Sequence, residues 1–371
     1  MMVQVTTTTR PRPVCILGLG LIGGSLLRDL AAAGREVFGY HRSPSTARSA
    51  RKEGFEVDSN LTETLARAEE TGALIVLAVP MPAVEGLLDA IAHETSTCGI
   101  TDVVSVKTPV MDLVYDKGLE DRYVGGHPMA GTAQSGWKAS QRGLFRGAAW
   151  VITFDHGYHP EARSVDELAE ADQATLGEPG RAALSPTGRP EVSSRWLDVW
   201  SQVAQLADSV GAETIPARVH VHDAMVARVS HLPHLLAAAL AVVGDNGGAL
   251  AFSLAAGSFR DGTRVAASSP QLVRAMLERN ARALVGPVDE AIEILTDARE
   301  RLSATPPDLE ALADAGYRSR VRFDARSGRV QGSVSPVEVS SRPVLRLRPG
   351  APGWIRTLVQ AEGLGARIEV Y

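Results

Sequence analysis

A histidine between glycines is the chemically most suggestive feature of this chain. His127 lies in the run Gly125-Gly126-His127-Pro128-Met129-Ala130-Gly131. An imidazole takes up a proton near neutral pH, so His127 is a candidate general base. Glycines on both sides would allow ligands to approach the backbone closely. The run follows an expected strand at residues 123–125, where a base would face a ligand bound at the sheet edge.

A glycine-rich turn near the N-terminus indicates which cofactor would act together with this base. Gly18, Gly20 and Gly23 follow the apolar run 14–17 and precede a helical pattern, which is the spacing of a dinucleotide-binding turn. The helix N-terminus would offer free N–H groups to a pyrophosphate. A glycine turn without a nucleotide is the alternative interpretation. With a nicotinamide bound, the expected chemistry is a dehydrogenation in which His127 removes the proton. The cofactor contacts that we expect, besides the three glycines, are Leu21, Ile22, His41, Arg42, Ser43, Val79 and Pro80.

The sequence leaves the choice between NAD and NADP open. An acidic residue about 20 positions after the glycine turn commonly binds the ribose 2′-hydroxyl of NAD. The second expected strand, 36–40, is instead followed by His41, Arg42 and Ser43. Arg42 and Ser43 could accept a 2′-phosphate, or they could be solvated loop residues.

A serine follows the expected strand at residues 101–104. Ser105, in Ser105-Val106-Lys107, would lie at the carboxyl end of that strand, where ligands bind in such sheets. It could orient a substrate hydroxyl or His127. A hydroxyl that bonds the local backbone in a turn is the alternative.

Three histidines gather in a later helical region. His231 and His234, in Ser230-His231-Leu232-Pro233-His234, lie on one helix face, and His222 precedes them. The spacing is not that of a zinc motif and no obvious carboxylate completes a site, so we predict no metal. Buried structural histidines and the binding of an anionic substrate remain as alternatives. Pro233 is expected to kink the helix.

An arginine cluster follows, in Ser258-Phe259-Arg260-Asp261-Gly262-Thr263-Arg264. The planar guanidinium groups of Arg260 and Arg264 suit bidentate binding of a carboxylate. Asp261 could hold one arginine in place. A solvated charge run is the alternative.

Composition sets limits on the fold and on the class of protein. The 371 residues favour two to three domains, and 44% hydrophobic and 22% charged residues are ordinary for a soluble protein. The net charge of −5 gives no sign of nucleic-acid binding. Two cysteines are too few for a disulfide framework, and Cys15 lies in an apolar run. Residues 1–13 do not resemble a signal peptide, so we expect a disordered N-terminus. No segment approaches about 18 uninterrupted apolar residues, so we expect no membrane span and a cytoplasmic protein.

Strand and helix patterns divide the chain. Apolar runs at 14–17, 36–40, 74–79, 101–104, 123–125 and 149–154 alternate with helical patterns, which predicts an α/β doubly wound parallel sheet within a dinucleotide-binding domain at 14–216. Residues 155–193 are expected to be a surface insertion, partly disordered, before a helix at 196–210. Residues 217–311 predict an all-helical domain. The tail, 315–371, predicts a small α+β module with strands at 321–323, 344–347 and 366–371 and a helix at 354–362.

Taken together, these motifs resemble the prephenate/arogenate dehydrogenase family of tyrosine biosynthesis over residues 14–310. The resemblance rests on the glycine turn 18–25, Ser105-Val106-Lys107, the His127 run, the Ser230–His234 motif and the Phe259–Arg264 motif, in that order. It implies an oxidative decarboxylation with NAD or NADP, in a Rossmann-type domain followed by a helical domain that forms a homodimer.

The resemblance also implies site residues. His127 matches the histidine that accepts the proton of the ring hydroxyl, and Ser105 matches the serine that hydrogen-bonds both groups. Arg264 matches the arginine that holds a substrate carboxylate. The other substrate contacts expected are His234, His222, His231, Arg260, Asp261 and Thr132.

Three alternatives to a prephenate dehydrogenase remain. An arogenate dehydrogenase differs only in an amino in place of a keto group on the substrate. A 3-hydroxyacid dehydrogenase normally carries a catalytic lysine in its helical domain, and residues 217–300 contain none. A non-catalytic nucleotide-binding regulator would have lost His127 or Arg264. The tail is too short for the regulatory ACT domain of some family members.

Overall fold

The structure, a computed structural model, describes residues 11–131, 134–168, 170, 192–326 and 342–371. It divides into two compact units. The first contains Met1–His220, Arg346–Glu362 and Ile368–Tyr371, and the second contains Val221–Leu345 and Gly363–Arg367. The predicted disorder of the N-terminus falls on residues 1–10, which lie outside the described residues.

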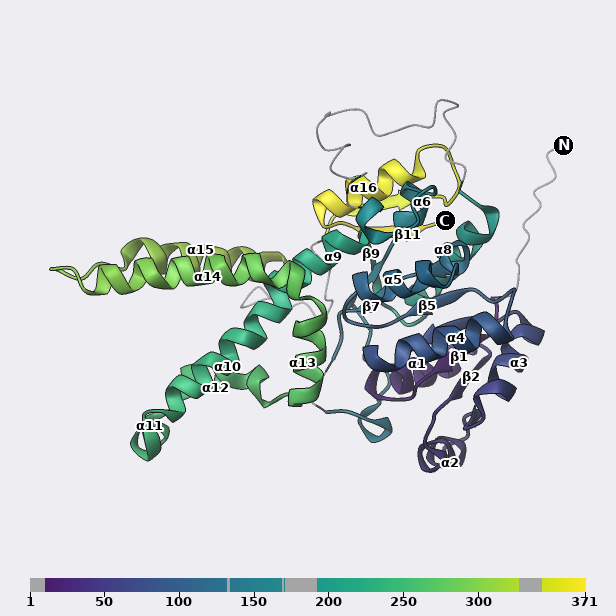
Figure 1. Cartoon of the computed structure of the whole chain (residues 1–371), viewed down its shortest axis with the longest axis horizontal. Helices are drawn as coiled ribbons and strands as arrows, with labels where there is room; N and C mark the ends of the chain where they lie inside the picture. The colour runs from purple at the N-terminus through teal and green to yellow at the C-terminus, as the bar shows by residue number, and fades with distance from the viewer. Residues whose placement is uncertain (1–10, 132–133, 169, 171–191, 327–341) are drawn as a thin grey trace, which may run out of the picture. The chain divides into compact units, whose positions relative to one another are not determined.

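A parallel sheet forms the centre of the first unit, in the strand order β3-β2-β1-β4-β5-β6. This order, with helices between the strands, is that of a doubly wound dinucleotide-binding sheet and confirms the predicted fold class. Its strands are β1 (Val14–Leu17), β2 (Val37–Tyr40), β3 (Val57–Asp58), β4 (Leu74–Leu77), β5 (Ile100–Asp102) and β6 (Tyr123–Val124). Its helices are α1 (Leu21–Ala32), α2 (Pro44–Lys52), α3 (Leu61–Thr71), α4 (Val84–Glu94) and α5 (Thr108–Asp116) (Figure 1).

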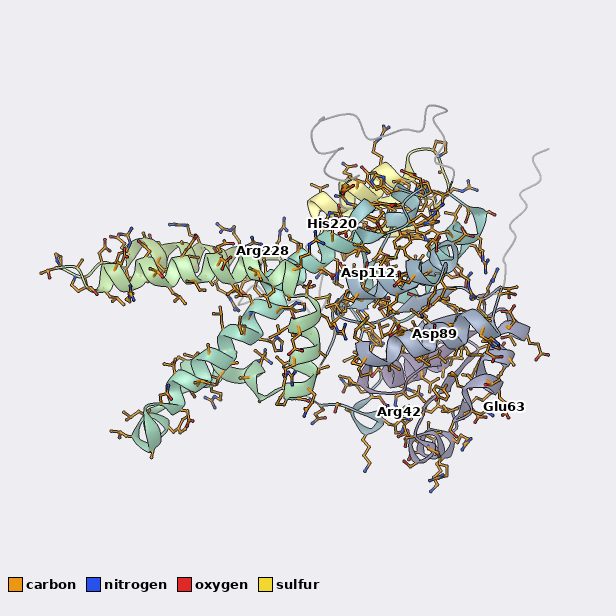
Figure 2. The ribbon with its side chains drawn as sticks, in the orientation of Figure 1. Arg42, Glu63, Asp89, Asp112, His220 and Arg228 are labelled. Carbon is orange, nitrogen blue, oxygen red and sulfur yellow. The ribbon has the colours of Figure 1, made fainter. Side chains whose placement is uncertain are left out.

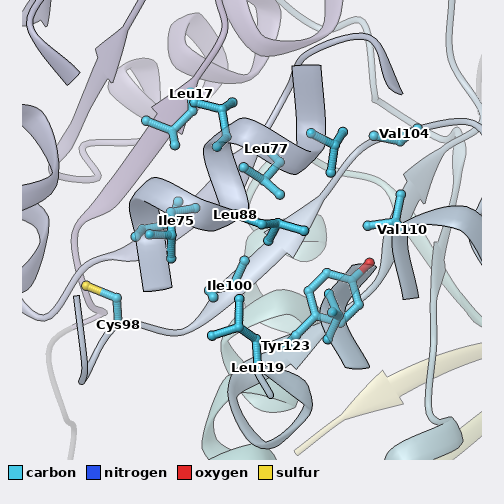
Figure 3. Close-up of a cluster of buried hydrophobic side chains, with 14 of the residues drawn as sticks. Leu17, Ile75, Leu77, Leu88, Cys98, Ile100, Val104, Val110, Leu119 and Tyr123 are labelled. Carbon is cyan, nitrogen blue, oxygen red and sulfur yellow. The ribbon is translucent and has the colours of Figure 1, made fainter. Parts of the chain in front are cut away.

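The apolar strands form the core of this unit. β1 and β4 are buried along their whole length, as expected for central parallel strands covered on both faces. Leu17, Ile75 and Leu77 pack with Leu88 of α4 in one cluster (Figure 3). Cys15 is fully buried, as predicted, and burial raises the pKa of its thiol. Cys98 is buried as well, which raises the pKa of its thiol to about 12. Both cysteines therefore serve as apolar core residues.

A second, three-stranded sheet begins where the first one ends. Its strands are β7 (Gly126–Pro128), β8 (Ala149–Ile152) and β9 (Glu213–Pro216), with β7 antiparallel and β9 parallel to β8. The sequence pattern assigns the run 149–154 to the doubly wound sheet. That prediction is wrong, because residues 149–152 form β8 of the second sheet. A strand pattern reports burial and not the identity of the neighbouring strand, so the sequence could not separate the two sheets.

The expected surface insertion at 155–193 is structured at its start. Helix α6 (Asp155–Tyr158) is buried at Asp155 and His156, and the Asp155 carboxylate accepts two hydrogen bonds of 3.0 Å from Val219 N. This part is therefore interior and not a surface loop. The prediction for residues 171–191 lies outside the described residues. Helix α8 (Ser194–Ser209) follows, close to the predicted range.

The second unit is helical, as predicted. Its elements are α9 (Val219–Val226), a π-helical turn (Ala227–His231), α10 (Leu232–Asp245), α11 (Gly248–Leu254), α12 (Gly257–Thr263), α13 (Pro270–Arg279), α14 (Ala281–Leu302) and α15 (Glu310–Arg326) (Figure 1). The strand predicted at 321–323 is wrong, because these residues lie within α15. Three alternating residues do not outweigh the helix-forming Ala and Arg residues around them.

The C-terminal segment packs onto the first unit. Strands β10 (Val344–Leu347) and β11 (Arg367–Val370) form a two-stranded sheet joined by helix α16 (Trp354–Leu364). The ring of Trp354 lies 5.2 Å from that of Trp200. The Glu362 carboxylate accepts hydrogen bonds from Arg218 N at 2.6 Å and from Arg218 Nε at 2.9 Å. Residues Arg346–Glu362 and Ile368–Tyr371 of this segment thus belong to the first compact unit.

One helical stretch, Val219–Asp245, is long and apolar enough to span a bilayer by length and composition alone. Its middle carries the polar residues Ser230, His231 and His234. His231 is buried and accepts a hydrogen bond from Asn280, which is the environment of a helix in a folded domain.

Candidate functional site

Five loops of the first unit leave the same edge of the parallel sheet. They follow β1 at residues 18–20, β2 at 41–43, β4 at 79–80, β5 at 103–107 and β6 at Gly125, which leads directly into β7, the strand that carries His127. Since the carboxyl ends of parallel strands lie at one edge, the structure gathers the predicted cofactor residues, Ser105 and His127 there. The switch point of the sheet, between β1 and β4, lies within this edge.

The three glycines of the turn have different roles. Gly18 has φ of 107°, and a Cβ there would lie 2.4 Å from the carbonyl oxygen of Ala78. A Cβ on Gly23 would lie 2.0 Å from the carbonyl oxygen of Gly18. Gly20 faces open space, with nothing within 4 Å of an added Cβ. Gly18 and Gly23 therefore allow close packing, whereas Gly20 leaves room for a ligand.

The N-terminus of α1 suits an anion. Gly20 is its N-cap residue, no side chain caps the first turn, and that turn has no acidic residue. The N–H groups at the start of the helix, at Leu21 and Ile22, therefore have no partner within the helix. Free N–H groups and the positive end of the helix dipole fit the pyrophosphate of a dinucleotide.

The end of β2 carries no carboxylate. Arg42 is exposed (Figure 2), and Ser43 N donates a 3.0 Å hydrogen bond to His41 Nδ1. Burial lowers the pKa of His41. On the neighbouring strand β3, Asp58 pairs with Tyr40, the last residue of β2.

Asp58 is engaged by the backbone. Its carboxylate accepts hydrogen bonds from Ser59 N at 2.5 Å and Asn60 N at 3.0 Å, and these bonds lower its pKa. Asp58 therefore stabilises the turn before α3 through its Oδ1 atom.

His127 lies in the middle of β7, paired with Val151 of β8. The side chains of His127 and Ser105 are both half-buried. Gly126 must be a glycine, because a Cβ there would lie 2.6 Å from the carbonyl oxygen of Asp102 in β5. This close approach fixes the strand that carries His127 against the strand that leads to Ser105.

The histidines of the second unit form a buried polar network. His222 Nδ1 lies 2.8 Å from Asp223 Oδ1. Asn280 Nδ2 donates to His231 Nδ1 at 3.0 Å and to Asp223 O at 2.8 Å. His234 Nδ1 donates to Ser230 O at 2.9 Å in the turn around Pro233. Among the described residues, no three His, Cys, Asp or Glu side chains are placed to hold a metal ion.

His231 is a neutral histidine. Burial lowers its pKa to about 4, and the charges of His222 and His234 act in the same direction against that of Asp223. Because Nδ1 accepts from Asn280, the ring proton lies on Nε2. His231 can therefore donate a hydrogen bond through Nε2 but supplies no positive charge at neutral pH.

The arginine cluster is exposed. Arg260 and Asp261 lie on α12 and Arg264 follows it, and all three side chains are exposed. In the part of the chain that the structure describes, no ion pair joins Asp261 to either arginine, and a role of Asp261 in holding one of them stays a prediction. The glycines serve packing: a Cβ on Gly262 would lie 2.8 Å from Leu240 Cδ2 of α10.

Several polar residues of these networks escaped sequence reasoning. Asp223 and Asn280 belong to the histidine network, and Asp102 lies beneath Ser105 and His127. Only Asp223 left a signal, as the direct neighbour of His222. Asn280 reaches His231 across 49 positions of sequence, which no local pattern reveals. Thr132 lies outside the described residues.

Two family models match the chain. Residues 26–174 match the model described as "Prephenate dehydrogenase, nucleotide-binding domain", and residues 219–315 match "Prephenate dehydrogenase, dimerization domain". The matches lie on the doubly wound sheet and on the helical unit respectively. The first match begins after β1 and the glycine turn and includes Ser105 and His127, and the second includes the three histidines and the arginine cluster.

Individual proteins agree with this match. A candidate prephenate dehydrogenase of Corynebacterium glutamicum, known as a crystal structure, is 54% identical, with a TM-score of 0.83 over 97% of this chain and 99% of that one. The prephenate dehydrogenase of Bacillus subtilis is 29% identical over 77% of this chain and 69% of its own length. The crystal structure of Synechocystis arogenate dehydrogenase is 26% identical, with a TM-score of 0.63 over 84% of this chain and 99% of that one.

The glycine turn and open helix N-terminus fit a nicotinamide dinucleotide, and the matching models cover both units of the fold. The chain therefore belongs to the prephenate dehydrogenase family and is a nicotinamide-dependent oxidoreductase of that family.

Proposed function

We propose that the chain is a prephenate dehydrogenase, which converts prephenate to 4-hydroxyphenylpyruvate and CO2 in tyrosine biosynthesis. One observation carries the proposal: the loop of Ser105 and the start of β7, which carries His127, follow the same sheet edge as the open glycine turn. A base, a hydroxyl and a dinucleotide site are thus gathered in one unit. The two family models support the same reaction class.

His127 acts as the base. Its imidazole accepts the proton of the C4 hydroxyl while that oxygen becomes a carbonyl, and Ser105 hydrogen-bonds the hydroxyl and holds its orientation. The nicotinamide, when bound, accepts the hydride from C4. The ring carboxylate then leaves as CO2, its bonding electrons make the ring aromatic, and the oxygen takes its proton back. General-base catalysis of this kind contributes roughly 10²–10⁴-fold.

The second unit supplies the substrate contacts. Arg264, with Arg260 beside it, is proposed to bind a carboxylate of the doubly charged substrate, because exposed guanidinium groups are available to a ligand. His222 and His234 are proposed to line the side-chain end of the pocket. His231 contributes a neutral N–H donor, and Asp261 and Thr132 complete the proposed set.

Both NAD and NADP are proposed as cofactors. No carboxylate follows β2 to repel a 2′-phosphate, and the exposed Arg42 with the Ser43 hydroxyl suits one. The ratio of kcat/KM for NADP and NAD measures this preference.

A homodimer formed through the helical unit is proposed as well. Large apolar side chains are exposed on α10, α11 and α14, among them Val243 at 68%, Leu250 at 70% and Leu295 at 61%. Such an exposed set is typical of an interaction surface, and the unit matches a dimerization domain. We propose a cytoplasmic location, in keeping with a biosynthetic enzyme.

Arogenate is the second candidate substrate, because the arogenate dehydrogenase of Synechocystis shares the fold at 26% identity. A two-by-two assay separates the candidates: prephenate and arogenate are each offered with NAD and with NADP, and nicotinamide reduction is followed by absorbance. The proposal predicts the highest kcat/KM with prephenate. A higher value with arogenate would identify an arogenate dehydrogenase, and no activity in all four combinations would contradict both assignments.

A further inference from the structure

A buried pair of opposite charges lies beneath the proposed base. Asp102, the last residue of β5, has no exposed surface, and Lys107 is only 1% exposed. Lys107 Nζ donates a hydrogen bond to Asp102 Oδ1. A buried ion pair adds little net stability, since the cost of removing both charges from water offsets their attraction. Its presence therefore calls for a reason other than stability.

The Asp102 carboxylate connects two loops. Oδ1 accepts a 2.7 Å hydrogen bond from Val104 N, directly before Ser105. Oδ2 accepts from Gly126 N at 3.4 Å, directly before His127, and from the Tyr123 hydroxyl at 2.5 Å. Figure 3 shows the Tyr123 hydroxyl as the polar end of a side chain that is otherwise among core residues. One side chain thus holds the backbone next to both proposed reactive residues.

Lys107 completes this arrangement. Its ammonium donates a 2.7 Å hydrogen bond to the carbonyl oxygen of Gly126. The N–H of Gly126 is bound by Asp102 and its C=O by Lys107, at the point where the chain leaves β6 of one sheet and enters β7 of the other. Apolar residues could fill the same volume but could not bind both groups of this peptide backbone.

We infer that Asp102 and Lys107 are positioning residues, which fix the backbone of Ser105 and His127 relative to each other so that hydroxyl and imidazole meet the same substrate oxygen. The inference rests on the proposed role of His127. Catalytic groups must be held to within fractions of an ångström, and a displacement of about 1 Å can cost about 10²-fold in rate.

Two substitutions test the inference, with one matched control. Asp102→Asn replaces one carboxylate oxygen by an NH2 group, which donates and cannot accept, and removes the negative charge. Tyr123→Phe removes one hydrogen bond without disturbing the charge pair. The control is Arg122→Met. Arg122 is also a buried cation that binds backbone carbonyls, those of Thr95 at 3.0 Å and Cys98 at 3.3 Å, at the opposite end of β6.

Steady-state kinetics and hydrogen–deuterium exchange are the two measurements. Asp102→Asn should lower kcat by about 10- to 100-fold with KM for substrate changed less than about threefold, and Tyr123→Phe should show a smaller drop of the same kind. Both should accelerate exchange in peptides 103–107 and 124–129 together. Arg122→Met should lower the melting temperature and accelerate exchange in 91–98, with kcat kept within about twofold.

The outcomes separate the two proposals. If His127→Asn keeps the wild-type kcat, the proposed function fails, and the exchange pattern still decides whether Asp102 holds the two loops. If His127→Asn is inactive but both substitutions keep kcat within about twofold, only the positioning inference fails. Unchanged exchange in either peptide would overturn it as well.

Discussion

Acid should destabilise the helical unit through His231. Its pKa in the folded protein is about 4, below the ordinary value of 6.5, because burial disfavours the charged ring. The unfolded chain therefore binds this proton at a higher pH than the folded one does. The stability that the neutral ring contributes is complete above pH 6.5 and is lost as the pH falls from 6.5 to 4. Between pH 7 and pH 5 the loss is about 2 kcal/mol, at 1.36 kcal/mol per pKa unit.

Comparison with a non-titrating variant isolates this effect. His231→Gln keeps a side-chain oxygen that can accept from Asn280 but takes up no proton. The free energy of unfolding is measured by urea denaturation followed by circular dichroism. Between pH 7 and pH 5, the wild type should lose about 2 kcal/mol more of this free energy than the variant does. His93→Gln serves as control, because the His93 side chain is 84% exposed. If the free energies of unfolding of wild type and His231→Gln differ by the same amount at both pH values, the lowered pKa and the neutral state of this ring are refuted.

Four further substitutions give distinct expected results. Gly23→Ala places a methyl group 2.0 Å from a backbone oxygen and should lower both the melting temperature and nucleotide affinity; unchanged nucleotide binding by calorimetry would contradict the packing argument. Glu362→Ala removes the carboxylate that accepts from Arg218 N and Arg218 Nε and should cost about 1.5–3 kcal/mol in unfolding free energy, whereas a loss below about 0.5 kcal/mol would show that the C-terminal segment is loosely attached. Arg42→Asp should lower kcat/KM for NADP by about 10- to 100-fold and spare NAD, and an equal effect on both would exclude a 2′-phosphate contact. Arg264→Ala should raise KM for prephenate far more than it lowers kcat, and an unchanged KM would remove Arg264 from substrate binding.

Features that depend only on residues close together in the sequence could be predicted from the sequence. The glycine turn 18–23 could be predicted because its spacing, the apolar strand before it and the helix after it are all local. The end of α1 is local as well: Gly34 has φ of 71°, a conformation that favours glycine, and its N–H donates to Ala31 O. The carboxyl edge of the sheet then follows from the alternation of strands and helices, which predicts that Ser105 and His127 lie near the cofactor loops.

Features that depend on pairing between residues far apart in the sequence could not be predicted. β3 is two residues long and has no pattern of its own, and the second sheet is defined by the pairing of 126–128 with 150–152. The polar networks were missed for the same reason. Asp102, Lys107 and Asn280 each bond to groups on other elements, and the burial that makes these bonds matter is a property of the folded core.

The central claim, that His127 removes the proton, is tested most directly by the kinetics of His127→Asn with the preferred substrate and cofactor. The account predicts a kcat lowered by roughly 10²–10⁴-fold with KM for substrate nearly unchanged, because asparagine keeps the size and polarity of the side chain but accepts no proton at neutral pH. A kcat close to that of the wild type, or an effect confined to KM, would show that another group is the base.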